Sequence, residues 1–203
     1  MVKTMNLRLV FVLSALMLLA SPVLRAETEL FYDDDSAETQ FSTAAAGTIE
    51  GIMFYPEHPA VLKKIKLMFS KTGSIEIHVW KDGGGNDPVS DGGDLITPIE
   101  YTVDEPGVWK EFDIFSAGVI LEKPEYVHVG VVRSVGGTGL KIDSSAGGLG
   151  YSYVYYPNDV AKYGVAGDFM ARLTVDYFGI AEERSFENVT ADAGVSSSWR
   201  PAW

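Results

Sequence analysis

Apolar and polar residues alternate with a period of two along much of the chain, and this pattern constrains the fold more than any other. Successive side chains of an extended strand point to opposite faces of a sheet, so the pattern is typical of strands buried on one face. Segments 64–69 and 74–81 each place three apolar residues on one face: Ile65, Leu67 and Phe69, then Ile75, Ile77 and Val79. The turn residues 71–73 between them predict an antiparallel hairpin.

The same alternation recurs further along the chain. Segment 126–132 directs three valines inward, and segment 169–178 directs inward Phe169, Ala171, Leu173, Val175 and Tyr177. Weaker patterns, bounded by Gly, Pro, Asp or Ser, predict strands at 48–54, 95–103, 109–115, 139–143 and 151–155. No segment shows a convincing amphipathic helix. About nine or ten short strands of this kind predict an all-β chain. The expected architecture is a two-sheet antiparallel β-sandwich that is jelly-roll-like.

The first 26 residues read as a secretory signal peptide. Lys3 and Arg8 precede an apolar run at 9–20, and Ala26 is a small residue suited to cleavage before Glu27. The run is shorter than the roughly 20 residues that a membrane-spanning helix needs. We therefore expect a secreted protein, extracellular or at the cell surface, with no membrane span once residues 1–26 are removed. Residues 27–178 would form the sandwich.

The amino-acid composition limits the kinds of partner that this module can bind. The 203 residues include no cysteine, which excludes thiol chemistry and disulfide staples, and the formal net charge is −12. Such an acidic surface repels a phosphate backbone, so nucleic acid is not an expected partner. Acidity of this kind suits extracellular solubility and divalent cations.

Two acidic segments are candidate calcium ligands. Asp33, Asp34 and Asp35 form a run of hard oxygen donors, and a loop with Asp82 and Asp87 nearly matches the GGxGxD element of calcium-binding β-rolls. The near-match occurs once, and a β-roll needs a repeat. Simple acidic turns and a long hairpin loop are the alternative interpretation of both segments.

A third candidate is an aromatic platform. Alternation places Tyr151, Tyr153 and Tyr155 on one face, with Trp80 as a possible neighbour. Rings that combine an apolar body with a polar tip suit the faces of sugars, which makes a glycan or another cell-surface molecule the expected ligand. The same rings commonly fill a sandwich core, and this alternative stays open.

The sequence contains few residues or motifs that are typical of catalysis. The three histidines are His58 in a turn and His78 and His128, which alternation places on outward faces. No nucleophile elbow, zinc-protease motif or phosphate-cradling loop is present. We therefore expect a non-catalytic module. The alternatives are a secreted carbohydrate-active or ester hydrolase with unidentified carboxylates, and a purely structural accessory domain.

Segment 31–38, which reads FYDDDSAE, is similar to the YDDGSAE opening of jelly-roll-like modules in secreted, multidomain bacterial proteins. Segment 77–85 resembles the VxVWxDxGGG strand and loop that follow in those modules. The chain has Asp35 where that pattern has glycine. The resemblance implies sandwich architecture and secretion, and it names no activity.

A second resemblance lies near the end of the chain. Segment 186–195 is similar to the F-x-[DN]-V-T-x-x-A-G-V lead-in of FG-GAP/VCBS repeat proteins, in which a calcium loop follows a tryptophan. The sequence ends at Trp203, before any such loop. We expect residues 179–203 to be a linker and the truncated start of a following repeat domain. The module would then have a binding or spacer role in a larger extracellular protein.

Overall fold

The computed structural model describes residues 27–40, 44–83, 93–135, 137–145, 151–157 and 162–178. The predicted signal peptide, 1–26, and the predicted linker, 179–203, lie outside these ranges. The described part is all-β, as the alternation predicts. Its short helical segment, η2 (Phe115–Ala117), is a single 3-10 turn. No helix in these ranges has the length and apolar character needed to cross a membrane.

One layer of the fold is a five-stranded antiparallel sheet with the order β1-β14-β4-β7, in which β8 also pairs with β4. Its strands are β1 (Glu27–Leu30), β14 (Ala171–Tyr177), β4 (Ala60–Met68), β7 (Trp109–Asp113) and β8 (Ile120–Leu121). The inward side chains of β4, Ile65 and Leu67, are fully buried, while Lys64 and Lys66 are partly exposed. The alternation therefore predicts the faces of this strand correctly.

The second layer is a six-stranded antiparallel sheet with the order β12-β11-β3-β9-β5-β6. Its strands are β12 (Tyr163–Gly164), β11 (Ser152–Tyr155), β3 (Ile49–Phe54), β9 (Val127–Arg133), β5 (Gly73–Lys81) and β6 (Ile99–Val103). The β3–β9 register pairs Ile52 with Val129, and both side chains are fully buried. This sheet is curled, and its two long central neighbours, β9 and β5, pair over seven residues.

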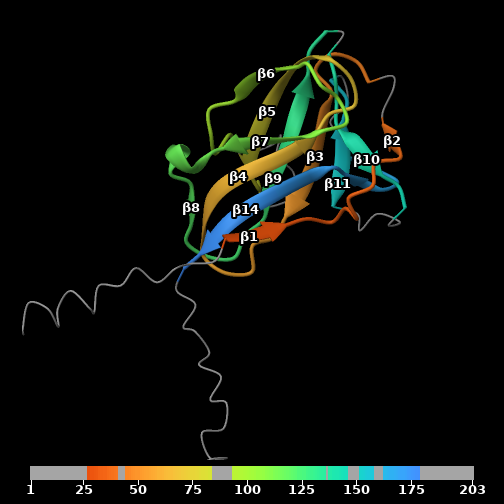
Figure 1. Ribbon diagram of the computed structural model, residues 1–203. Helices are drawn as coiled ribbons and strands as arrows, with labels where there is room; N and C mark the ends of the chain where they lie inside the picture. The colour runs from red at the N-terminus through yellow and green to blue at the C-terminus, as the bar shows by residue number, and fades with distance from the viewer. Residues whose placement is uncertain are drawn as a thin grey trace, which may run out of the picture.

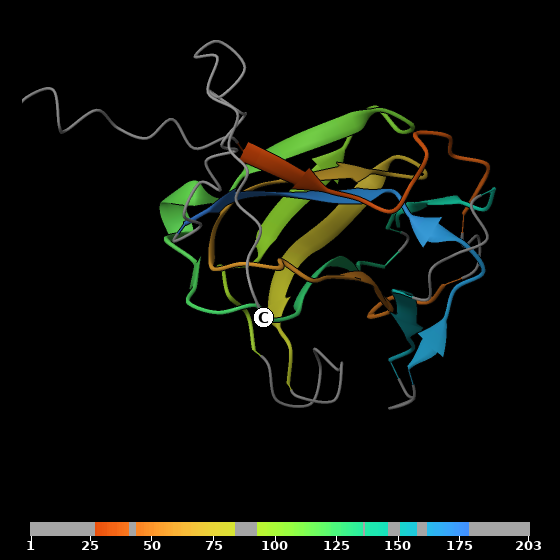
Figure 2. The same ribbon diagram turned by 90° about the horizontal axis from the view of Figure 1, so that it is seen from below.

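The two layers pack face to face as a β-sandwich. Figure 1 shows β4 and β14 in front of β9 and β5, and Figure 2 shows the same layers from below. Apolar side chains of both sheets form one core between them, among them Ile52, Phe54, Leu62, Ile65, Leu67, Ile77, Val129, Leu173 and Val175. Burial of this apolar surface is the main stabilising contribution in a chain without disulfides.

A small three-stranded sheet lies at one end of the sandwich, with the order β13-β10-β2. Its strands are β13 (Asp168–Phe169), β10 (Lys141–Asp143) and β2 (Thr39–Gln40). An isolated bridge between Phe69 and Leu140 links this sheet to the end of β4. The chain passes from β13 into β14 with only Met170 between them. The small sheet is thus held rigidly against the five-stranded sheet, and it carries the candidate site.

The predicted hairpin between segments 64–69 and 74–81 is wrong. Strand β4 pairs with β14, β7 and β8, whereas β5 pairs with β6 and β9, so the two strands lie in different layers. The connection at 71–73 crosses between sheets. Gly73 has a φ of 143°, and its Cα faces the backbone of Gly137 and Thr138 closely. Turn residues allow either a hairpin or such a corner, so composition does not distinguish the two.

His78 and His128 lie on the outer face of the six-stranded sheet, as the alternation predicts, but this face is not open to solvent around them. Their strands do turn alternate residues away from the core, but both side chains are buried there, with 8% and 0% of their surface exposed. Tyr153 lies across Gly51 on this outer face, where a Cβ atom on the glycine would be 2.5 Å from the Tyr153 Cζ atom. The curled sheet therefore buries part of both its faces.

Candidate functional site

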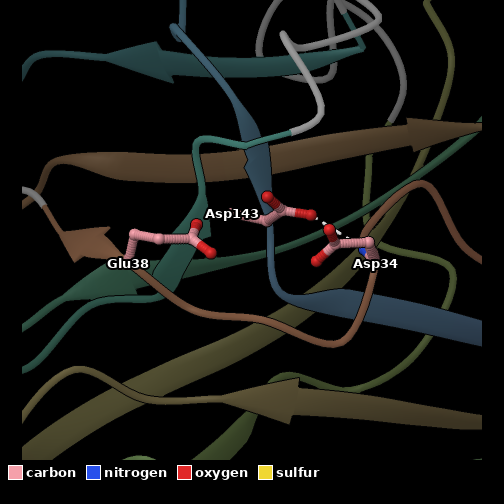
Figure 3. Close-up of side chains that lie close together, drawn as sticks. All are labelled: Asp34, Glu38 and Asp143. Atoms are coloured by element: carbon pink, nitrogen blue, oxygen red, sulfur yellow. Dashed lines mark hydrogen bonds between the residues drawn. The ribbon is translucent and has the colours of Figure 1, made fainter.

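Three carboxylates converge beside the small sheet. Asp34, Glu38 and Asp143 each offer one oxygen atom, and these three atoms lie within 4.8 Å of one another. Figure 3 shows the carboxylates of Glu38 and Asp34 on either side of that of Asp143. Asp143 is fully buried, whereas Asp34 and Glu38 are exposed to solvent. The cluster therefore has one carboxylate inside the protein and two at the surface, where solvent can reach them.

Backbone pairing brings these residues together. Strands β2 and β10 pair antiparallel, with Thr39 opposite Ile142, and the Glu38 amide donates a hydrogen bond to the Ile142 carbonyl at 3.1 Å. Glu38 and Asp143 thus extend this pairing by one residue. The Asp34 amide donates to Asp143 Oδ2 at 2.8 Å, across 109 residues of sequence. The loop between β1 and β2 is therefore closed over the end of β10.

Serine hydroxyls and backbone amides keep the exposed carboxylates ionised. Hydrogen bonds from Ser36, then from Ser145, lower the pKa of Asp34 to about 2. Bonds from the Ser36 hydroxyl and the Ser144 amide lower the pKa of Glu38. Both groups carry a negative charge at neutral pH, next to a third carboxylate.

The arrangement is suited to a hard divalent cation. Calcium takes six to eight oxygen ligands, and three converging carboxylates, with nearby hydroxyls and open access for water, supply ligands of this type. Among the described residues, no lysine or arginine forms a salt bridge with Asp34, Glu38 or Asp143. Like charges placed opposite each other on paired strands repel. A bound cation would remove that repulsion.

The other two aspartates of the run have a different role. Asp33 is buried, and it accepts a hydrogen bond from Arg172 Nε at 3.2 Å and a second one from Nη2. Asp35 accepts bonds from Arg172 Nη2 at 2.8 Å and from Trp109 Nε1 at 2.9 Å. The guanidinium lies 4.4 Å from the centre of the Trp109 ring. These aspartates anchor the loop to β14 and β7.

Asp35 has a left-handed backbone conformation, at the position where the resembling pattern has glycine. Its φ is 75°, and no other non-glycine residue in the described ranges has a positive φ. Aspartate tolerates this conformation better than most residues because its short side chain bonds locally. Asp35 therefore adopts this turn conformation and also makes the contacts with Arg172 and Trp109.

The second predicted calcium segment lies elsewhere. Asp82 follows β5, and its Oδ1 atom is 3.5 Å from Nε2 of His128. Asp87 lies outside the described residues. The structure therefore does not bring Asp82 to the cluster formed by Asp34, Glu38 and Asp143.

The predicted aromatic platform is packed rather than open. Tyr153 has no exposed surface, and its hydroxyl lies 2.8 Å from His128 Nδ1. Tyr155 packs edge-on against Tyr153, and Trp80 is buried in a stack with His78 at 4.8 Å. Tyr151 stacks on Tyr32 at 4.7 Å and also packs against the cluster of Met53, Tyr153 and Tyr155. The structure thus brings all three tyrosines together, as packed side chains rather than as an open platform.

The sequence analysis does not identify Asp143 as a ligand. The residue ends a short predicted strand, and no acidic neighbour marks it out. Its partners lie more than 100 residues away, and they meet it only through the β2–β10 pairing. The serine pair that follows, Ser144 and Ser145, is the one local hint of a turn rich in hydrogen bonds.

Comparisons with known proteins add no family. No protein-family model matches the chain, and no curated protein matches it. The function is therefore argued from the site itself.

Proposed function

We propose that the chain is a non-catalytic binding module of an exported, larger protein, and that it holds a structural Ca²⁺ ion through Asp34, Glu38 and Asp143. The observation that carries the proposal is the convergence of three carboxylates from two distant segments. The ion would link the loop after β1 to β10. Disulfides provide links of this kind in many other exported proteins. Loops fixed on a rigid sandwich are a common platform for recognition.

The state of the histidines supports a non-catalytic role. His78 and His128 are buried, and each has a ring nitrogen 2.8 Å from an oxygen, of Asp94 and Tyr153 respectively. A general base must reach a substrate proton within hydrogen-bonding distance. Buried imidazoles that already have partners are poorly placed for that role. Export and the multidomain context are supported by the leader-like sequence 1–26 and by the resemblance of segment 186–195.

Thermal unfolding tests the calcium site. A ligand that binds only the native state raises its stability, by about 2.7 kcal/mol at a concentration 100-fold above Kd. For a domain of this size, that corresponds to an increase in Tm of roughly 5–11 °C. We expect added Ca²⁺ to raise Tm, and EDTA to reverse the effect. Mg²⁺ at equal ionic strength should do less, because it demands a tighter octahedral site.

Matched variants locate the effect. Glu38→Gln and Asp143→Asn should abolish the calcium-dependent shift. Asp104→Asn, at an acidic side chain that is 81% exposed and outside the cluster, should retain it. A Tm that does not respond to calcium, or a response that survives both cluster variants, would refute the proposed site.

A further inference from the structure

A groove lies along the edge strand β1 of the five-stranded sheet. It has a volume of about 570 Å³, and five ring side chains line it: Phe31, Tyr32, Tyr55, His58 and Tyr177. The carboxylates of Glu29 and Glu57 also line it, together with Thr28 and Leu30. The groove shares no residue with the calcium cluster, and the sequence analysis did not single it out.

The rings of this groove include exposed ones. Phe31 and Tyr55 expose 53% and 42% of their surface. Exposed aromatic surface beside polar groups is typical of ligand sites. Residues buried on the outer face of the six-stranded sheet, such as Tyr153, have no such surface.

Neighbouring contacts fix the rings in place. Tyr55 packs on Tyr126 with the ring centres 4.7 Å apart, and His58 meets Tyr177 edge to face at 5.5 Å. A rigid surface of this kind loses little conformational entropy when it binds a ligand.

The polar groups indicate what kind of ligand fits. Glu29 forms salt bridges with Lys66 at 2.6 Å and with Arg172 at 3.4 Å, so its carboxylate is held at the wall of the groove. Glu57 forms no salt bridge with any described residue, so its carboxylate is available to accept hydrogen bonds. Two carboxylates, on a chain whose net charge is −12, repel an anion.

From this combination we infer that the groove binds a neutral saccharide chain. Pyranose rings with equatorial hydroxyls present apolar C–H faces that stack on aromatic rings, and hydroxyl edges that donate to carboxylates. The inference rests on the proposed binding role, for which it supplies a site and a ligand class.

Isothermal titration with cellohexaose and xylohexaose tests this inference on the full chain. We expect at least one of them to bind, and Tyr55→Ala to weaken that binding at least tenfold. Tyr163→Ala is the matched control, because Tyr163 has a similar exposure of 44% but lies on β12, away from the groove. It should change the affinity less than twofold. Glu57→Gln, at an exposed position, provides a second variant that does not depend on ring packing.

Several outcomes would overturn the inference. The first is that neither hexasaccharide binds at millimolar concentration. The second is that the Tyr55 and Tyr163 variants lose affinity equally. The third is that oligogalacturonate or hexalysine binds more tightly than the neutral chains. A calcium-dependent Tm measured on the same samples separates the two proposals. If that shift persists without saccharide binding, the groove proposal alone fails. If saccharide binds without a calcium shift, the metal site alone fails.

Discussion

Arg133 and Glu50 form an ion pair inside the fold, and removal of the arginine should strongly destabilise the protein. The side chains expose 3% and 0% of their surface. Arg133 Nε donates to Glu50 Oε1 at 2.5 Å, and the Leu140 amide donates to Glu50 Oε2 at 2.6 Å. In Arg133→Met the carboxylate loses its counter-ion while it remains buried.

The expected cost follows from that burial. Removal of one partner of a buried ion pair typically costs about 3–5 kcal/mol, because an uncompensated charge remains in a medium of low polarity. For a domain of this size the loss corresponds to a fall in Tm of roughly 6–20 °C. The double variant E50Q/R133M should lose less, about 1–3 kcal/mol, because a neutral amide still accepts from the Leu140 amide.

Urea denaturation of the wild type, both single variants and the double variant gives the coupling free energy directly. Leu140 leads into β10, which ends at Asp143, so Arg133→Met should also weaken the calcium-dependent rise in Tm. The reasoning fails if Arg133→Met costs less than about 1 kcal/mol, or if the double variant is as unstable as the sum of the two single ones.

Two further predictions concern the loop between β1 and β2. Asp35→Ala should cost about 1–2 kcal/mol, because alanine disfavours the φ of 75° and loses the bonds with Arg172 and Trp109. Asp35→Asn should cost less than Asp35→Ala, and equal unfolding free energies for the two variants would contradict this account. The second prediction concerns pH in the absence of calcium. The pKa of Asp34 falls from an ordinary 3.8 to about 2, and that of Glu38 is also lowered. The stability they contribute is present above the unfolded pKa values and is lost as the pH falls toward about 2. Asp34→Asn should flatten the stability profile over that range, and an unchanged acid limb of the profile would show that the carboxylate does not contribute.

Alternation predicts strands and faces well where one face meets the core and the other meets water. It correctly places Ile65 and Leu67 inward in β4. It does not predict which strand pairs with which. Residues 71–73 can turn the chain within a sheet or carry it to the other layer, and the choice depends on packing between strands that are distant in sequence.

The same pattern does not predict that His128 is buried, and the reason is physical. Alternation assumes that the face opposite the core is open to solvent. The curled six-stranded sheet places glycines there, and the Tyr153 ring fills the space above Gly51 and reaches the histidine. Glycines inside a strand pattern are therefore the feature of the sequence that could have indicated burial on both faces.

The three aspartates of the run have two different sets of partners, and this difference explains where a cation is expected. The turn at Asp35 directs neighbouring side chains apart, so Asp33 and Asp35 face Arg172 while Asp34 faces Asp143. The guanidinium compensates the first two carboxylates. Asp34 instead joins two further acids and, among the described residues, forms no salt bridge with a basic side chain. The sequence alone predicts the donors but not this partition, because the partition depends on a single arginine 137 residues after Asp35. The negative charge that no basic side chain compensates therefore lies at the small sheet, and this is where the proposed cation would bind, rather than along the run as a whole.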